Sequence, residues 1–169
     1  MIRKIYVTPA QVSGYVHEII RGINYDDWRP DYIVGLSRGG LTPALMLSHY
    51  LRIPMHTLEI SLRDGGKQVS DLGMAEDAFG YEAEPKKILI VDDINDSGAT
   101  MNWLKADWQA GCLPNSERWS EVWNQNVRFA VLHDNQSSEF SDVDYAAVDI
   151  NKVEDDCWIV YPWENWWSL

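Results

Sequence analysis

Residues 86–101 read KKILIVDDINDSGATM and give the clearest indication of how this chain folds. Residues 88–91 form a continuous, mostly β-branched apolar run, which is typical of a strand buried on both faces of a parallel sheet. The run ends in two carboxylates, Asp92 and Asp93, and a short polar turn leads to a helical pattern from Thr100. Ligands of open α/β sheets bind just beyond the carboxyl ends of such strands. The stretch therefore predicts a ligand site at a strand end.

The turn after this strand has the composition of an anion site. Its residues are small or short-chained, so backbone N–H groups and two hydroxyls can surround one anion: Asp96, Ser97, Gly98, Ala99 and Thr100. Gly98 can adopt a positive φ, and the helix that follows adds a partial positive charge. Asp92 and Asp93 suit ribose hydroxyls or a hydrated Mg²⁺ that bridges to substrate phosphates. The alternative is that Asp96 or Ser97 simply caps the helix.

A second turn of similar character follows the apolar residues 32–36. It reads Ser37-Arg38-Gly39-Gly40 and precedes a helix-like pattern over residues 41–51. A strand, a glycine-rich turn with one arginine and a helix form a suitable combination for holding an anion. The alternative is an ordinary connection with an exposed arginine. Two such turns on separate strands can hold opposite ends of one substrate.

The third segment, residues 157–164, offers aromatic rings and one acid near the C-terminus. A flat heterocycle is well held by a ring against one face and a few polar contacts at its edge. Trp158 and Glu164 provide these two kinds of group. The alternative is that the aromatic residues close the core.

These three segments together resemble the type I phosphoribosyltransferases. Residues 91–100 resemble the phosphoribosyl pyrophosphate loop, and Ser37-Arg38-Gly39-Gly40 is similar to the pyrophosphate loop of the bacterial xanthine–guanine branch. Residues 158–164 resemble the nucleobase-binding tail of the xanthine–guanine and hypoxanthine enzymes. The resemblance implies an α/β fold with a mostly parallel sheet flanked by helices, a flexible active-site loop and a small C-terminal nucleobase-binding hood.

The resemblance also implies a role for each candidate site residue. Asp92 and Asp93 would bind the ribose diol, directly or through Mg²⁺, and Asp96 would act near purine N7. The remaining substrate contacts would come from both turns and the tail: Ser37, Arg38, Gly39, Asn95, Ser97, Gly98, Ala99, Thr100, Trp158, Ile159 and Glu164.

One feature departs from the family pattern. The 6-oxopurine enzymes place a lysine just after the strand that precedes the tail, where it meets the exocyclic oxygen. The matching stretch is residues 129–135, which contains no lysine, and His133 is the nearest substitute. A neutral imidazole is a weaker and shorter donor than an ammonium group. The preferred base is therefore open, and the alternative for His133 is a strand-end histidine without a role.

Composition indicates the class of protein. The 169 residues support one domain, and Cys112 and Cys157 form no disulfide framework, which favours a reducing compartment such as the cytoplasm. The N-terminus lacks the apolar core of a signal peptide, and no run approaches the length of a membrane span. The 26 acidic residues outnumber 14 basic ones, giving a net charge of −12, which argues against nucleic acid as a partner.

The rest of the chain follows an α/β order. A helix from Pro9, capped by Thr8, precedes predicted strands at residues 32–36, 55–62, 127–132 and 145–150. Helices are expected at residues 41–51 and 100–110. Residues 61–85 lack periodicity and are expected to form a mobile loop over the site. Residues 105–126 are interpreted as a tryptophan-rich insertion, part of a subunit contact, and residues 151–169 as the base-binding segment.

The sequence therefore predicts a single domain, residues 1–169, that acts as a Mg²⁺-dependent purine phosphoribosyltransferase. Its partners would be phosphoribosyl pyrophosphate and a 6-oxopurine base, and the resemblance implies a homodimer or higher homo-oligomer. Two alternatives stay open. One is a regulatory protein that binds phosphoribosyl pyrophosphate without turnover, and the other is a phosphoribosyltransferase for another base, such as a pyrimidine.

Overall fold

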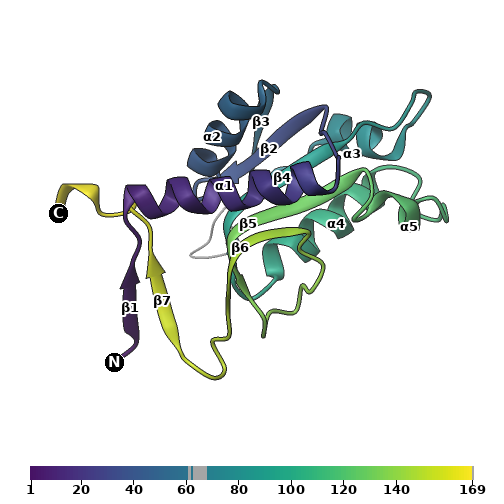
Figure 1. The fold of residues 1–169 in the computed structure, drawn as a ribbon. Coiled ribbons are helices and arrows are strands. Elements are labelled where there is room, and N and C mark those ends of the chain that lie inside the picture. The colour runs from purple at the N-terminus through teal and green to yellow at the C-terminus, as the bar shows by residue number, and fades with distance from the viewer. Residues whose placement is uncertain (61, 63–67, 169) are drawn as a thin grey trace.

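The computed structural model describes residues 1–60, 62 and 68–168, and contains a five-stranded parallel sheet (Figure 1). The strand order is β3-β2-β4-β5-β6, and the strands are β2 Tyr32–Ser37, β3 Met55–Glu59, β4 Ile88–Asn95, β5 Val127–Asn135 and β6 Tyr145–Ile150. A separate parallel pair is made by β1 Arg3–Tyr6 and β7 Cys157–Val160. The predicted α/β fold with a mostly parallel sheet is confirmed.

Helices cover both faces of the sheet (Figure 1). One face packs against α1 Pro9–Tyr25 and α2 Leu41–Leu51, and the other against α3 Leu72–Phe79, α4 Ala99–Gly111 and α5 Trp119–Val122. Neighbouring residues of one strand enter different cores: Leu89 packs on the α1 side, whereas Ile88 and Ile90 pack on the α4 side. This double burial explains the uninterrupted apolar run. A short 3₁₀ helix, Trp166–Ser168, follows at the C-terminal end.

Helix α1 begins where the sequence predicts. Thr8 Oγ1 accepts from the backbone N–H of Gln11 at 3.1 Å, and the Gln11 side chain accepts from the backbone N–H of Thr8 at 2.8 Å. This reciprocal capping box satisfies two helix-start donors, and Pro9 occupies the first turn. No helix among the described residues is long and apolar enough to cross a bilayer.

Strand β4 is longer than the sequence pattern indicates. Asp92 pairs with Val131, Ile94 with His133 and Asn95 with Asp134 of β5, so the strand continues past its apolar run. The polar residues end the apolar run but not the strand, because the backbone pairing with β5 continues to Asn95. In contrast, β3 ends at Glu59, short of the predicted residue 62, and Ile60 forms an isolated bridge with Gln68.

The prediction of a loop over residues 61–85 is wrong for its central part, which forms α3. Asp71 caps this helix by accepting from the backbone N–H of Met74 at 2.9 Å, and Gly80 ends it with φ +78°. The helix is short, and its buried residues cover only two turns, so its periodicity is weak. Residues 61 and 63–67 of the predicted loop lie outside the described residues.

The predicted insertion at residues 105–126 has a different boundary, because α4 continues to Gly111. Its tryptophans serve the core: Trp108 and Trp119 are buried, and the Trp119 and Trp123 rings stack with centroids 5.3 Å apart. Trp119 Nε1 also donates to the backbone oxygen of Cys112 at 2.8 Å. This packing accounts for the three tryptophans of the segment, Trp108, Trp119 and Trp123. A subunit contact at this segment stays a prediction.

Candidate active site

The candidate site lies where the strand order reverses. Helix α2 leads from β2 outward to β3, whereas α4 leads from the neighbouring β4 in the opposite direction to β5. The carboxyl ends of β2 and β4 are therefore a topological switch point, the usual ligand site of such sheets. A cleft of about 1170 Å³ opens there.

This cleft brings together the three segments that the sequence singled out. The predicted site residues that line it are Ser37, Arg38, Gly39, Asp92, Asp93, Asn95, Asp96, Ser97, Gly98, Ala99, Thr100, Trp158, Ile159 and Glu164. Residues of the 37–40 turn, of the 96–100 turn and of the C-terminal tail thus line one cleft.

The 37–40 turn packs directly against the acidic pair. A Cβ atom on Gly39 would overlap with the carboxylate of Asp93, and one on Gly40 would overlap with the backbone oxygen of Val91. Only glycine allows this approach. The peptide between Ser37 and Arg38 is cis, and Arg38 is exposed at the cleft.

The 96–100 turn leads into α4, which begins at Ala99. Gly98 has φ +88°, and a Cβ there would overlap with the backbone nitrogen of Phe140 and with Ser138 Oγ. The turn is thus held close to the segment after β5. Ser97 Oγ accepts from the backbone N–H of Ala99 at 3.3 Å. The N-terminus of a 13-residue helix at the cleft favours a bound anion.

The acidic pair is half-buried between the two turns. Asp92 Oδ1 accepts from the backbone N–H of Asp93 at 2.9 Å, and Asp93 Oδ1 accepts from that of Ile94 at 2.8 Å. The described residues contain no group of three or more side chains placed to hold a metal ion. Two adjacent carboxylates nevertheless suit Mg²⁺, which keeps several waters and completes its shell with substrate phosphates.

Asn95 supports the 96–100 turn from behind. Its buried amide donates to Asp134 Oδ1 and to the backbone oxygen of Phe140, both at 2.8 Å, and accepts from Ser138 Oγ at 2.9 Å. Asn95 was expected to contact the substrate, and it lines the cleft, but its side-chain amide bonds to Asp134 of β5 and to Ser138 and Phe140 after β5.

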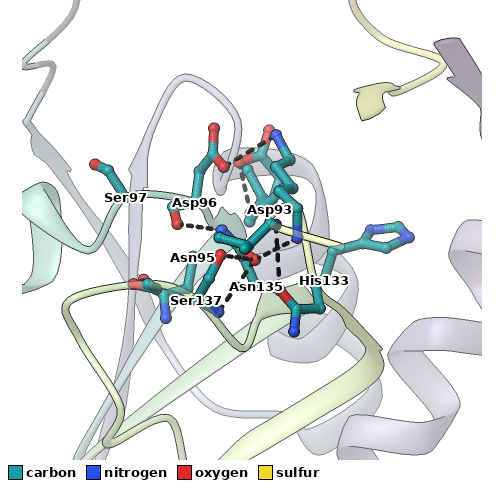
Figure 2. A network of polar contacts seen from close by, with 12 residues as sticks. Asp93, Asn95, Asp96, Ser97, His133, Asn135 and Ser137 are labelled. Carbon is teal, nitrogen blue, oxygen red and sulfur yellow. Dashed lines mark hydrogen bonds and ion pairs between the residues drawn. The ribbon is translucent and has the colours of Figure 1, made fainter. Parts of the chain in front are cut away.

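A second buried amide, Asn135, joins the turn to the loop after β6 (Figure 2). It is 6% exposed and donates to the backbone oxygen of Asp96 at 2.9 Å. Its Oδ1 accepts from Ser137 Oγ at 2.8 Å and from the backbone N–H of Lys152 at 3.0 Å. One side chain thus fixes Asp96 and Lys152 relative to each other.

Lys152 is a site residue that the sequence reasoning missed. Its Nζ lies 2.9 Å from Asp96 Oδ1 and 5.6 Å from the ring centroid of Trp158, and the residue lines the cleft. The available signal was its place directly after the predicted strand at residues 145–150. The family resemblance instead assigned the lysine position to residues 129–135, one strand earlier.

His133 is not among the residues that line the cleft. It is 3% exposed, its ring meets Tyr15 edge to face, and Nδ1 lies 2.8 Å from the Tyr161 hydroxyl. Burial, and secondly the charge of Lys152, lowers the pKa of His133 to about 4. Because β5 continues to Asn135, residue 133 lies inside the sheet. The expected contact of His133 with a base is therefore corrected to a contact with Tyr161.

The tail contributes aromatic residues to the lining of the cleft, among them Trp158 and Trp163. Trp158 is 41% exposed, whereas Ile159 is buried in the core on the α1 side. The Trp163 ring stacks on Tyr161 with centroids 4.9 Å apart, and the backbone N–H of Glu164 donates to the backbone oxygen of Tyr161 at 3.1 Å. Strand β1, which the sequence analysis did not predict, pairs Lys4 with Trp158 and holds β7 in place.

Comparisons with known proteins agree with this geometry. Residues 9–164 match the family model described as the phosphoribosyl transferase domain. A hypoxanthine-guanine phosphoribosyltransferase of Schizosaccharomyces pombe is 26% identical over 82% of this chain and 79% of that protein. A xanthine-guanine phosphoribosyltransferase of Idiomarina loihiensis is 29% identical over 78% of this chain and 70% of that protein. The crystal structure of a purine phosphoribosyltransferase from Pyrococcus horikoshii superposes with a TM-score of 0.67 at 26% identity, covering 96% of this chain and 95% of that one.

Proposed function

The chain belongs to the phosphoribosyl transferase domain family, and we propose that it transfers the phosphoribosyl group of phosphoribosyl pyrophosphate to a 6-oxopurine. The products are pyrophosphate and a nucleoside monophosphate. The base could be guanine, xanthine or hypoxanthine. The relatives named above act on bases of this class, which supports the choice.

The observation that carries the proposal is that the 37–40 and 96–100 turns, which follow the neighbouring strands β2 and β4, line one cleft. Gly39 of one turn lies against Asp93, which is separated from the other turn by two residues. Phosphoribosyl pyrophosphate has a phosphate at one end, a diphosphate at the other and two ribose hydroxyls between them. The order of groups in the cleft matches the order of groups in this molecule.

Each part of the cleft takes one part of the substrate in this proposal. Backbone N–H groups of the 96–100 turn, with the start of α4, hold the 5′-phosphate. Arg38 and the backbone of Ser37 and Gly39 hold the pyrophosphate. Asp92 and Asp93 accept from the ribose hydroxyls, and both would also hold Mg²⁺, which supplies charge neutralisation for the pyrophosphate when bound.

The three acidic residues have different roles as bonds break and form in this reaction. The bond between C1 of the ribose and the pyrophosphate oxygen breaks, its electron pair leaves with pyrophosphate, and C1 bonds to a ring nitrogen of the base. Positive charge develops on the ribose as the leaving group departs, and the carboxylates of Asp92 and Asp93 stabilise it. The base loses a proton, and Asp96 is the group we assign to accept it at N7.

A turnover assay with a panel of bases tests the proposal. Purified protein is incubated with Mg²⁺, phosphoribosyl pyrophosphate and one of guanine, xanthine, hypoxanthine, adenine, uracil or orotate, and nucleotide is measured by chromatography. We expect nucleotide with at least one 6-oxopurine. Binding of phosphoribosyl pyrophosphate without product from any base would favour a regulatory protein instead. Product from adenine or a pyrimidine alone would reject the assigned substrate class.

A further inference from the structure

The first two carbonyl oxygens of the 96–100 turn are bound by residues that lie outside the cleft. Asn135 Nδ2 donates to the Asp96 carbonyl at 2.9 Å, and the backbone N–H of Glu139 donates to the Ser97 carbonyl at 3.0 Å. Asp96 and Ser97 line the cleft, whereas Asn135 and Glu139 are not among the residues that line it. Both carbonyls therefore point away from the cleft, toward the end of β5 and the segment after it.

The direction of these carbonyls sets the direction of the N–H groups that follow them. The peptide bonds of the turn are trans, and in a planar trans peptide the C=O of one residue and the N–H of the next point in opposite directions. The N–H of Ser97 therefore points away from Asn135, toward the cleft. For the same reason the N–H of Gly98 points away from Glu139.

Both N–H groups are available to an anion. Neither the N–H of Ser97 nor that of Gly98 donates to another residue in the part of the chain that the structure describes, whereas the N–H of Ala99 is used by Ser97 Oγ. Two neighbouring N–H groups that face the same side of a turn form a nest for a negatively charged oxygen. The proposed function places the 5′-phosphate at this nest.

The orientation of the Asn135 amide is fixed by its other contacts. Its Oδ1 accepts from the backbone N–H of Lys152 at 3.0 Å and from Ser137 Oγ at 2.8 Å. A backbone N–H can only donate, so the amide oxygen must face Lys152 and the amide nitrogen must face the Asp96 carbonyl. The side chain is 6% exposed, so water does not compete for these bonds.

We propose that Asn135 is a positioning residue for the 5′-phosphate of the substrate. It does not touch the phosphate but acts through the peptide between Asp96 and Ser97, whose N–H it directs into the cleft. Without the amide this peptide can rotate and turn its carbonyl, which carries partial negative charge, toward the phosphate. The inference rests on the proposed function, because that function places the 5′-phosphate in the 96–100 turn.

Two variants of Asn135 and one matched control test the inference. Asn135→Leu removes the donor at similar size, and Asn135→Asp keeps an acceptor but replaces the donor with an oxygen. Asn126 directly precedes β5, and its amide donates to the backbone oxygens of Ala78 and Lys86 at 2.8 and 3.0 Å. Asn126→Leu therefore removes the same kind of contact at the other end of the strand, away from the cleft. Asn135→Asp carries the comparison if the leucine variant does not fold.

The amide signals of ¹⁵N-labelled protein report the two N–H groups separately. Phosphoribosyl pyrophosphate with Mg²⁺ should move the Ser97 and Gly98 signals downfield in wild-type protein and in Asn126→Leu. In the Asn135 variants the Ser97 signal should lose most of this shift. The Gly98 signal should keep its shift, because Glu139 still holds the Ser97 carbonyl. Equal changes at both signals, or none at Ser97, would show a merely structural asparagine and overturn the inference.

Titration calorimetry separates the 5′-phosphate from the other end of the substrate. We expect both Asn135 variants to bind phosphoribosyl pyrophosphate at least about tenfold more weakly than wild-type protein and Asn126→Leu do, because a hydrogen bond to a charged group is lost. Magnesium pyrophosphate, which has no ribose or 5′-phosphate, should bind all four proteins equally.

An equal loss for the two ligands, or an unchanged affinity for phosphoribosyl pyrophosphate in the Asn135 variants, overturns the inference alone. Wild-type protein that does not bind phosphoribosyl pyrophosphate overturns the proposed function together with the inference. The two failures are therefore distinguished by the wild-type titration.

Discussion

The hydroxyl of Tyr161 donates to the backbone oxygen of Asp93 at 3.0 Å. A carbonyl oxygen only accepts, so the Tyr161 proton lies on this bond, and Nδ1 of His133 must donate to the Tyr161 oxygen at 2.8 Å. Burial, followed by the charges of Asp93 and Asp92, raises the pKa of Tyr161 well above its ordinary value, so the hydroxyl keeps its proton. A buried chain from His133 of β5 through Tyr161, the residue after β7, thus supports the backbone at Asp93.

Removing the Tyr161 hydroxyl should weaken both the fold and the site. Tyr161→Phe leaves the Asp93 carbonyl and His133 Nδ1 without their partner, and we expect a loss of about 1–3 kcal/mol in unfolding free energy. The KM for phosphoribosyl pyrophosphate should rise severalfold because the acidic pair loses its support. Urea unfolding and steady-state kinetics measure the two effects. Wild-type stability in this variant would contradict the assigned chain of hydrogen bonds.

His133 makes the stability of the protein depend on pH in a definite direction. Its pKa is about 4 in the folded protein, against 6.5 ordinarily, so the residue is neutral in both states above pH 6.5 and its contribution is then complete. Between pH 6.5 and 4 only the unfolded chain takes up the proton. Unfolding is therefore favoured as the pH falls, by up to about 1.4 kcal/mol per pH unit.

Urea unfolding at several pH values tests this effect. His133→Gln should lose stability less steeply than wild-type protein between pH 6.5 and 4.5, although it is less stable at pH 7. His17→Gln is the control, because His17 is exposed on α1 and should follow the wild-type slope. Parallel slopes for His133→Gln and wild-type protein would show that His133 does not titrate as described.

The acidic pair should matter for turnover and little for folding. Asp92→Asn with Asp93→Asn keeps an acceptor for each backbone N–H but removes both charges, so we expect turnover to be abolished and unfolding free energy to change by less than about 1 kcal/mol. Asp156→Asn, exposed in the loop before β7, is the control. Full activity in the double variant would refute the assignment of this pair.

Gly39 and Gly14 make a matched pair for alanine substitution. A Cβ on Gly39 overlaps with the Asp93 carboxylate, whereas one on Gly14 meets nothing within 4 Å. Gly39→Ala should displace Asp93 and raise the KM for phosphoribosyl pyrophosphate tenfold or more. Gly14→Ala lies on an exposed helix face and should raise the unfolding free energy by about 0.5–1 kcal/mol without affecting kinetics. If Gly39→Ala had the same kinetics as Gly14→Ala, substrate binding would not depend on the packing of the 37–40 turn against the acidic pair.

The elements predicted well from the sequence are those with strong local signals. Thr8 and Pro9 mark a helix start by their own chemistry, and the run at residues 88–91 marks a buried strand because both faces of the sheet are covered. The turns at residues 37–40 and 96–100 are recognised by their small residues, which let backbone N–H groups approach an anion. Their meeting in one cleft followed from the general rule for parallel sheets.

The remaining features depend on pairings that are distant in sequence. His133 was misplaced because the length of β5 is set by its backbone pairing with β4 and β6 rather than by its own residues. Lys152 pairs directly with Asp96, and Asn135 holds the backbones of both residues, contacts that no local pattern indicates. Strand β1 is short and mostly exposed, so it lacks the apolar alternation by which strands are recognised.

The most direct measurement is a crystal structure of the protein with phosphoribosyl pyrophosphate and Mg²⁺. The central claim is that the two turns hold the two phosphorylated ends of one pentose. We predict density for the 5′-phosphate within the 96–100 turn, for pyrophosphate beside Arg38 and for the ribose hydroxyls at Asp92 and Asp93. A bound substrate that leaves either turn empty, or lies away from the acidic pair, would contradict the claim.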